Sequence, residues 1–142
     1  MQLNDTLSLK REIKSYGFAR PFWEGTRQKK VVIQYCKATK KFQHFPRPTS
    51  IFTGRMKDIE WREIPGTGTV FSWTITHRGT DNFRKVEPYA VACVTFDEAN
   101  VNHIANMVNC TPEDLKVGMK VVPYWMPLDD GTHLLMFQPA RS

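Results

Sequence analysis

The sequence predicts a mainly β protein in which a five-stranded barrel follows an N-terminal helix and a basic, proline-containing module. Residues 69–140 hold five β-rich runs, separated by turn residues and by one short helical signal. The chain has 142 residues, a length that suits one domain or one domain with a small appendage. Hydrophobic residues make up 41% and charged residues 24%, a composition typical of a globular domain with a buried core.

The first 30 residues are expected to form a helix and a docking segment. Asp5 or Thr6 can cap a helix over residues 5–16, and Gly17 is a typical residue to end it. Pro21 and Gly25 then predict an irregular segment. The large aromatic residues of that segment are expected to pack either on this domain or on a partner; they are Phe18, Phe22 and Trp23.

Residues 31–60 form a basic module. A short β-rich run covers 31–36, the following segment is interrupted by Pro46 and Pro48, and Gly54 indicates a turn. Residues 1–60 carry 13 Lys and Arg against 5 Asp and Glu, whereas residues 61–142 carry 7 against 9. This uneven charge is compatible with nucleic acid, an acidic partner, a phosphate-rich ligand such as coenzyme A, or simply a solvated basic face.

The barrel is predicted from residue 61 to residue 142. An alternating segment at 58–64 precedes it, and the run at 87–98 is long enough to be buried on both faces. Thr111 and Pro112 predict one helical turn. Five antiparallel strands of this length favour a small closed barrel, and the OB-fold is the first candidate. The strands are expected at 69–77, 87–98, 100–108, 120–128 and 132–140.

No catalytic constellation is predicted. The four histidines include no pair four residues apart, and the spacing of Cys36 and His44 matches no metal template. The Gly-rich segment at 66–69 lies between two strands and is interpreted as a turn, because a phosphate site would need a following helix. Cys93 is expected to be buried and inert, whereas the helical turn after Cys110 is expected to lower the pKa of that thiol slightly.

Three cysteines cannot build a disulfide framework, so they are interpreted as reduced thiols. The sequence contains no apolar run of about 18 residues and its first residues lack the apolar core of a signal peptide. We therefore expect a cytoplasmic protein with no membrane partner.

Several segments together resemble the family known as domain of unknown function thirty-five. Their order and spacing carry the resemblance, which covers nearly the whole chain. The segments are ARPFWEG at 19–25, YCKAT at 35–39, FPRP at 45–48, DIEWREIPGTGTVFSWTITH at 58–77, EPYAVACVTFDEA at 87–99, VGMKVVPYW at 117–125 and MFQPA at 136–140.

The resemblance implies an OB-fold preceded by an N-terminal helix and a rubredoxin-like zinc ribbon, here at 31–60. The family's ribbon has two Cys-x-x-Cys knuckles. At the matching positions this chain has Cys36, Thr39, Ser50 and Thr53. Because hydroxyl groups are poor zinc ligands at neutral pH, we expect a degenerate, metal-free ribbon with no bound cofactor.

The resemblance also implies a non-catalytic bridging subunit of a thiolase-like acyltransferase complex. Its partners would be a thiolase-like catalytic subunit and a second, ketosynthase-like subunit, and the subunit would help to form an acyl or coenzyme A channel. The short, cysteine-poor chain resembles the small subunit of monoacetylphloroglucinol acetyltransferase complexes, which implies acylation of a phloroglucinol-type ring carbon.

The residues expected at these contacts fall into two groups. Partner docking is expected at Phe18, Arg20, Phe22, Trp23 and Phe45, and contacts with the phosphates of coenzyme A or acyl-CoA at a subunit interface are expected at Lys29, Lys30 and Arg47. The alternative is an OB-fold protein that binds single-stranded nucleic acid. Because the barrel half carries more acidic than basic residues, nucleic-acid binding is the less favoured hypothesis. A free-standing enzyme is a third hypothesis.

Overall fold

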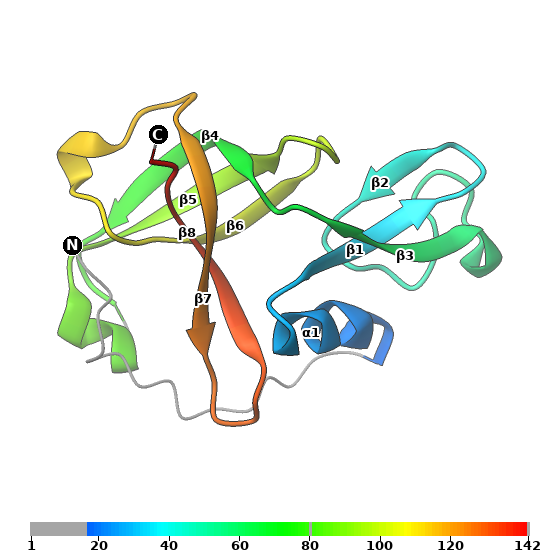
Figure 1. Cartoon of the computed structure of the whole chain (residues 1–142), viewed down its shortest axis with the longest axis horizontal. Coiled ribbons are helices and arrows are strands. Elements are labelled where there is room, and N and C mark those ends of the chain that lie inside the picture. The colour runs from blue at the N-terminus through cyan, green and yellow to red at the C-terminus, as the bar shows by residue number, and fades with distance from the viewer. Residues whose placement is uncertain (1–16, 80, 142) are drawn as a thin grey trace.

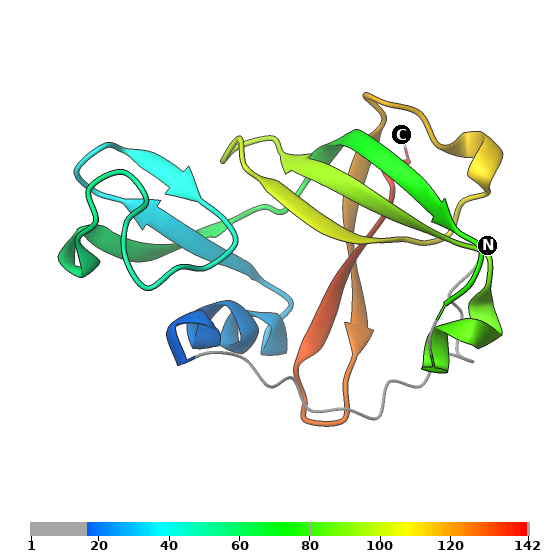
Figure 2. The same cartoon turned by 180° about the vertical axis from the view of Figure 1, so that it is seen from behind.

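The computed structural model describes residues 17–79 and 81–141, so the helix expected over 5–16 lies outside the described residues. A small three-stranded sheet and a closed barrel lie side by side, and a short helix lies beneath the sheet next to the barrel (Figures 1 and 2). A mainly β protein with a five-stranded barrel and one short N-terminal helix is thus confirmed.

The segment expected to be irregular is helical. A 3₁₀ turn at Gly17–Ala19 leads into helix α1, Arg20–Arg27. Pro21 lies in the first turn, where its missing N–H costs nothing. A Cβ at Gly25 would lie 2.7 Å from Cγ2 of Val32, so the absent side chain lets α1 approach the first strand closely.

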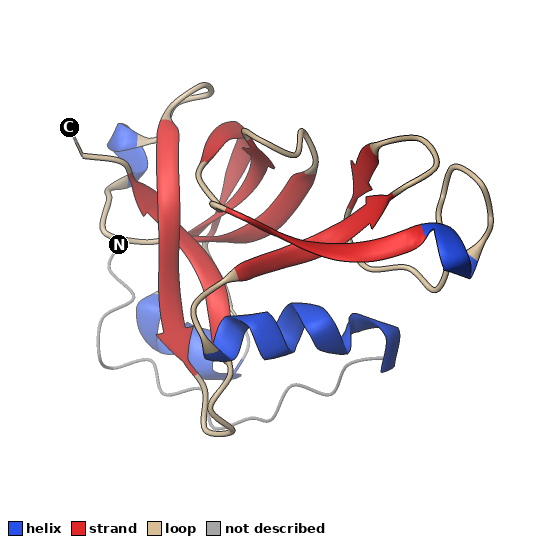
Figure 3. Ribbon diagram, turned by 45° about the vertical axis from the view of Figure 1, so that its right-hand side comes forward, coloured by secondary structure: helices blue, strands red, loops and turns tan. Residues whose placement is uncertain are grey.

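The first sheet, here called the ribbon sheet, consists of β1 (Val31–Cys36), β2 (Lys41–Gln43) and β3 (Ile59–Ile64). Both pairings are antiparallel, with β1 in the centre. The chain between β2 and β3 forms a long loop that ends in a 3₁₀ turn, Met56–Asp58. Figure 3 shows α1 running beneath β1 and β3 toward the barrel.

The barrel strands follow the order β4-β5-β6-β8-β7 and close into a ring. The contact between β6 and β8 is parallel, through Met107 and Phe137, whereas every other pairing is antiparallel. The expectation of five antiparallel strands is wrong at this seam, because an odd number of strands cannot alternate in direction all the way around a closed ring. The strands are β4 (Gly68–Thr76), β5 (Tyr89–Phe96), β6 (Asn102–Met107), β7 (Lys120–Pro127) and β8 (His133–Pro139), with 3₁₀ turns at Asp81–Val86 and Pro112–Asp114.

The central strand β5 is buried on one face only. Its residues alternate between buried and half-buried along the whole strand, and Cys93 is half-buried. The expectation that this strand and Cys93 would be fully buried is wrong, since the side chains on the outer face of the strand are only partly covered by the described part of the chain. On β4 the alternation is interrupted by an irregularity between Val70 and Ser72, beside which Phe71 faces solvent.

Gly66 joins the ribbon sheet to the barrel. Its φ is +82°, and a Cβ there would lie 2.7 Å from Cγ2 of Val31 and 2.9 Å from Cγ of Pro123. The segment expected to be a turn therefore serves as a crowded crossing between β3 and β4. One hydrophobic core continues through this junction and includes Phe22 from α1, Ile33 from the ribbon sheet and Phe137 from the barrel.

Within residues 17–79 and 81–141, no helix has the length and apolar character needed to span a bilayer.

Candidate functional site

Three of the four positions that match the family's knuckles meet at Cys36, and the fourth, Thr53, is linked to them through its backbone N–H. The Ser50 hydroxyl donates a hydrogen bond to Cys36 Sγ at 3.2 Å and accepts the backbone N–H groups of Phe52 and Thr53 at 3.1 and 3.2 Å. Thr39 also contacts the thiol through its backbone and side chain. The knuckle geometry is thus held by hydrogen bonds instead of coordinate bonds.

This donor set does not fit zinc. Of the four positions only Cys36 offers sulfur, and the Ser50 hydroxyl is already occupied by three hydrogen bonds. The Thr53 hydroxyl donates to Asp58 Oδ2 at 2.7 Å. Burial alone would raise the pKa of the Cys36 thiol, but the hydrogen bonds from Ser50 and Thr39 outweigh it and lower the pKa below its ordinary value.

Two buried glutamines hold the loop after β2. Gln34 Nε2 donates to the Arg47 carbonyl at 2.8 Å, and Gln34 Oε1 accepts the Arg47 N–H at 2.9 Å. Gln43 Nε2 donates to Gln34 Oε1 at 2.8 Å and to the Thr49 carbonyl, while Gln43 Oε1 accepts the N–H of Ile51. Because buried amide groups need these partners, the loop has one favoured conformation.

The loop presents an apolar and basic surface, here called the ribbon tip, which comprises residues 37–57. Ile51 is 61% exposed, Phe52 42% and Met56 71%. The same residues include six Lys and Arg and no Asp or Glu. Lys41 lies 5.6 Å from the centroid of the Phe52 ring, so charge and apolar surface interleave. Exposed apolar side chains gathered in this way are typical of a protein interaction site.

A second feature, here called the junction cavity, lies where α1, the ribbon loop and the barrel meet. It has a volume of about 290 Å³ and is lined mainly by apolar side chains, together with His44, His103 and Asn106. His44 Nε2 lies 2.9 Å from His103 Nδ1, so one imidazole donates a hydrogen bond to the other. The rings of Phe22 and Phe45 pack against both histidines.

Both histidines of this pair are uncharged at neutral pH. Burial lowers the pKa of His44 to about 3, with a smaller contribution from repulsion by His103, and burial lowers the pKa of His103 to about 4. His44 Nδ1 is buried and has no hydrogen-bond partner among the described residues. Sequence reasoning did not find this pair, because the two residues are 59 positions apart and no motif links them.

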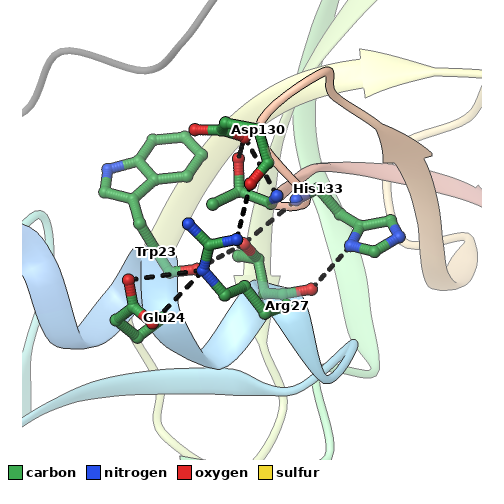
Figure 4. A network of polar contacts seen from close by, with 7 residues as sticks. Trp23, Glu24, Arg27, Asp130 and His133 are labelled. Atoms are coloured by element: carbon green, nitrogen blue, oxygen red, sulfur yellow. Dashed lines mark hydrogen bonds and ion pairs between the residues drawn. The ribbon is translucent and has the colours of Figure 1, made fainter.

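The opposite end of α1 is tied to the hairpin between β7 and β8 (Figure 4). The Thr26 hydroxyl donates to the Trp23 carbonyl at 2.6 Å and accepts the His133 N–H at 3.1 Å. His133 Nδ1 lies 2.8 Å from the Thr26 carbonyl, which can only accept, so this nitrogen carries the proton. Arg27 Nη1 donates to the Asp130 carbonyl at 2.5 Å. These contacts fix α1 against the barrel.

The structure separates the residues expected to dock a partner. Phe22 is only 5% exposed and packs in the core, where it contacts Trp23 at a ring distance of 5.1 Å. Trp23 is half-buried in the wall of the junction cavity. Phe45 and Arg20 are exposed, and Phe18 lines a shallow groove beside the ribbon sheet. Of this set, Arg20 and Phe45 present the most accessible side chains.

The residues expected to contact coenzyme A phosphates lie at two places. Lys29 and Lys30 are exposed in the turn between α1 and β1, and Lys30 lies 3.8 Å from Glu63. Arg47 is held through its backbone to Gln34, in the second half of β1. The lysines and Arg47 are therefore spread along β1.

The pKa of the Cys110 thiol is shifted in the opposite direction to the one expected. Burial raises the pKa of its thiol, and the nearby Asp114 carboxylate raises it further. The predicted lowering is wrong because the following 3₁₀ turn has only three residues, too few to build an effective helix dipole. The Asp114 carboxylate instead accepts the N–H of Thr111 at 2.9 Å and caps the turn.

The closed barrel with a preceding three-stranded sheet and helix defines an OB-fold protein with a ribbon-like extension. A sequence model of the family described as ChsH2, C-terminal OB-fold domain, matches residues 61–126. The structure is similar to a chain of the complex titled Ltp2-ChsH2(DUF35) aldolase, with a TM-score of 0.80 and 30% identity, over 92% of this chain and all of that chain. The chain belongs to the DUF35 family.

Curated relatives agree with this family. A probable enoyl-CoA hydratase alpha subunit of Thermomonospora curvata is 34% identical over 84% of this chain. A DUF35 domain-containing scaffold protein of Methanocaldococcus jannaschii is 29% identical over 62% of this chain. The chain spans 37% of the length of the first relative and 66% of the second. A DUF35 structure from Sulfolobus solfataricus shares the fold, with a TM-score of 0.62 and 18% identity.

Proposed function

We propose that the chain is a non-catalytic scaffold subunit of a thiolase-like acyl-CoA enzyme complex. The observation that carries this proposal is the likeness of this chain to a chain of the complex titled Ltp2-ChsH2(DUF35) aldolase, over the full length of that chain. Relatives named as scaffold proteins and as an enoyl-CoA hydratase alpha subunit support the same role. The ribbon tip, rigid, apolar and basic, supplies a surface suited to a large acidic protein partner.

We further propose a reaction for this complex and the subunits that it contains. The scaffold would order a catalytic subunit and a second, ketosynthase-like subunit for acylation of a phloroglucinol-type ring carbon, in the cytoplasm. Lys29, Lys30 and Arg47 would contribute positive charge where coenzyme A phosphates approach an acyl channel. The ribbon is proposed to work without zinc, since hydrogen bonds of Ser50 and Thr53 occupy the groups that a metal would need.

The test is affinity purification of the tagged chain from its native host, with identification of partners by mass spectrometry. We expect a thiolase-like protein with a reactive cysteine. Phe52→Asp at the ribbon tip should reduce its recovery at least tenfold, whereas Val117→Asp, a 72% exposed residue in the segment before β7, should not. Figure 1 shows that the segment between β6 and β7 lies on the side of the barrel away from the ribbon sheet. Recovery of no such enzyme would contradict the proposal.

The alternative function is single-stranded nucleic-acid binding, which is suggested by the OB-fold and the six cations of the ribbon tip. It predicts oligonucleotide binding that weakens steeply with salt. Weak binding to mixed-sequence oligonucleotides at moderate salt would leave the scaffold role as the better proposal. Robust acyl transfer by the isolated chain would contradict both.

A further inference from the structure

The junction cavity has the composition of a small-molecule site. Its volume of about 290 Å³ is about twice that of an apolar cavity that accepts benzene. The rings of Phe22, Trp23 and Phe45 form aromatic walls, and Ile104 and Leu135 add aliphatic surface. Among the described residues, the lining contains no Lys, Arg, Asp or Glu. An apolar wall with a few polar groups is typical of ligand pockets.

The histidine pair supplies the polar groups. Two neutral imidazoles have four nitrogens and two protons, and one N–H is used in the hydrogen bond between His44 Nε2 and His103 Nδ1. The outer nitrogens, His44 Nδ1 and His103 Nε2, therefore always comprise one donor and one acceptor. Which nitrogen is the donor depends on which histidine donates the shared proton. His44 Nδ1 has no partner among the described residues, so the pair has unused hydrogen-bonding capacity.

We propose that the junction cavity binds a small, uncharged ring compound that carries a hydroxyl group. A hydroxyl both donates and accepts, so it can pair with the outer nitrogen His103 Nε2 in either arrangement of the protons, whereas His44 Nδ1 is enclosed by the surrounding protein. The ring would pack against the aromatic walls, where two fused six-membered rings match the volume. All of the lining residues come from this one chain, so binding can be tested without a partner subunit, although Phe45 also belongs to the residues expected to dock one.

An anionic ligand is disfavoured in the same cavity. A carboxylate or phosphate would lose its water without gaining a cation, since the described lining has none and the histidines are uncharged. The phosphates of a coenzyme would have to bind at the exposed lysines and arginines instead. The charge of the probe therefore distinguishes this site from binding to the basic surface.

The experiment is calorimetric titration of the full-length chain at pH 7 with 2-naphthol and, in parallel, with 2-naphthoate. We expect saturable one-to-one binding of 2-naphthol and at least tenfold weaker binding of the anion. Long-range ¹H–¹⁵N spectra should show shifts at the imidazoles of His44 and His103, while the signals of His77 stay unchanged.

Two variants fill the cavity from different elements. Ala105→Trp enters from β6 and Ala19→Leu from the turn before α1, and each should abolish binding of 2-naphthol. Ala38→Leu, on an exposed turn of the ribbon sheet, is the matched control and should bind as the parent does. The double replacement His44→Phe with His103→Phe should weaken binding about three- to tenfold, which is the loss expected for one hydrogen bond.

Circular dichroism of each variant shows whether it remains folded. If Ala105→Trp does not fold, Ala19→Leu and the imidazole spectra of the parent carry the test. Failure of 2-naphthol to bind the folded parent would overturn the proposal. Equal affinity for 2-naphthoate, or unchanged affinity in a folded cavity-filled variant, would also overturn it.

Discussion

The burial of His44 and His103 makes the stability of the protein depend on pH. The pKa values of both side chains are lowered, to about 3 and about 4, whereas an unfolded chain binds protons at its histidines near pH 6.5. Between about pH 4 and 6.5 the unfolded state therefore holds more protons than the folded state. The resulting stability is complete above about pH 6.5 and declines as the pH falls below it.

The free energy of unfolding, measured with urea, should fall between pH 7.5 and pH 5 in the parent, because protonation favours the unfolded chain. In the double variant His44→Phe with His103→Phe, the fall should be much smaller. His77→Phe, at an exposed position, is the control and should keep the slope of the parent. An equal slope in the double variant would show that the buried pair does not cause the pH dependence.

The Ser50 hydroxyl stabilises the ribbon loop. It accepts two backbone N–H groups of the ribbon loop and donates to Cys36. Ser50→Ala should lower the free energy of unfolding by about 1–3 kcal/mol, since both N–H groups lose their acceptor. It should also raise the pKa of the Cys36 thiol, which can be followed by thiolate absorbance. Ser72→Ala, on the exposed part of β4, should change neither quantity.

At the scale of elements, the ribbon loop keeps the outline of a metal knuckle without its ligands. Replacement of Thr39, Ser50 and Thr53 by Cys would restore the four thiols of the family's two knuckles, and Zn–S bonds of about 2.3 Å require sulfurs about 3.8 Å apart. The present distance from Ser50 Oγ to Cys36 Sγ, 3.2 Å, is close to that requirement.

The triple variant Thr39→Cys, Ser50→Cys, Thr53→Cys is therefore expected to bind one zinc ion per chain and to gain thermal stability when loaded. The parent chain, purified in the same way, is expected to hold much less than one equivalent. Elemental analysis and melting curves with and without a chelator measure both expectations. Stoichiometric zinc in the parent would contradict the proposal of a metal-free ribbon.

Helix α1 depends on its contacts with the β7–β8 hairpin. Thr26 is fully buried, and Thr26→Val should lower the free energy of unfolding by about 1–3 kcal/mol, because the His133 N–H loses its acceptor. Arg27→Ala serves as a comparison, since Arg27 is exposed and its ion pair with Glu24 is worth no more than about 1 kcal/mol. A larger loss in Arg27→Ala than in Thr26→Val would show that the surface contacts hold the helix.

At the scale of the whole molecule, the crossing at Gly66 sets how the ribbon sheet meets the barrel. Gly66→Ala should destabilise the protein by about 2 kcal/mol or more, because a Cβ adds a clash with Val31 and Pro123 to the cost of a positive φ. Gly54→Ala is a matched control, since Gly54 also has a positive φ, +72°, but has no atom within 4 Å of its Cβ position.

Denaturation curves of the two variants separate these costs. The extra loss of unfolding free energy in Gly66→Ala, compared with Gly54→Ala, measures the clash at the junction between the two sheets. Adding Val31→Ala to Gly66→Ala should recover part of this loss, because it removes the clashing methyl groups. Equal losses in Gly66→Ala and Gly54→Ala would mean that the crossing tolerates a side chain and that the sheets can shift apart.

Local patterns in the sequence predicted most of the strands. The run VVIQYC and the five barrel strands appear within one or two residues of the expected ranges, because alternation and turn residues act over short distances. Helix α1 was missed, since Pro21 and Gly25 read as breakers when their neighbours are unknown. In the structure both residues fit the helix. Pro21 lies in its first turn, and Gly25 lies where the helix closely approaches Val32.

The mainly β fold and the resemblance to the DUF35 family could both be predicted from the order of residues, because strand periodicity and motif order are local properties. The parallel seam between β6 and β8, the pairing of His44 with His103 and the contact between Thr26 and His133 arise only when the chain has folded. These features join residues that are far apart in the chain. Their chemistry arises from distance and burial, which the order of residues alone does not contain.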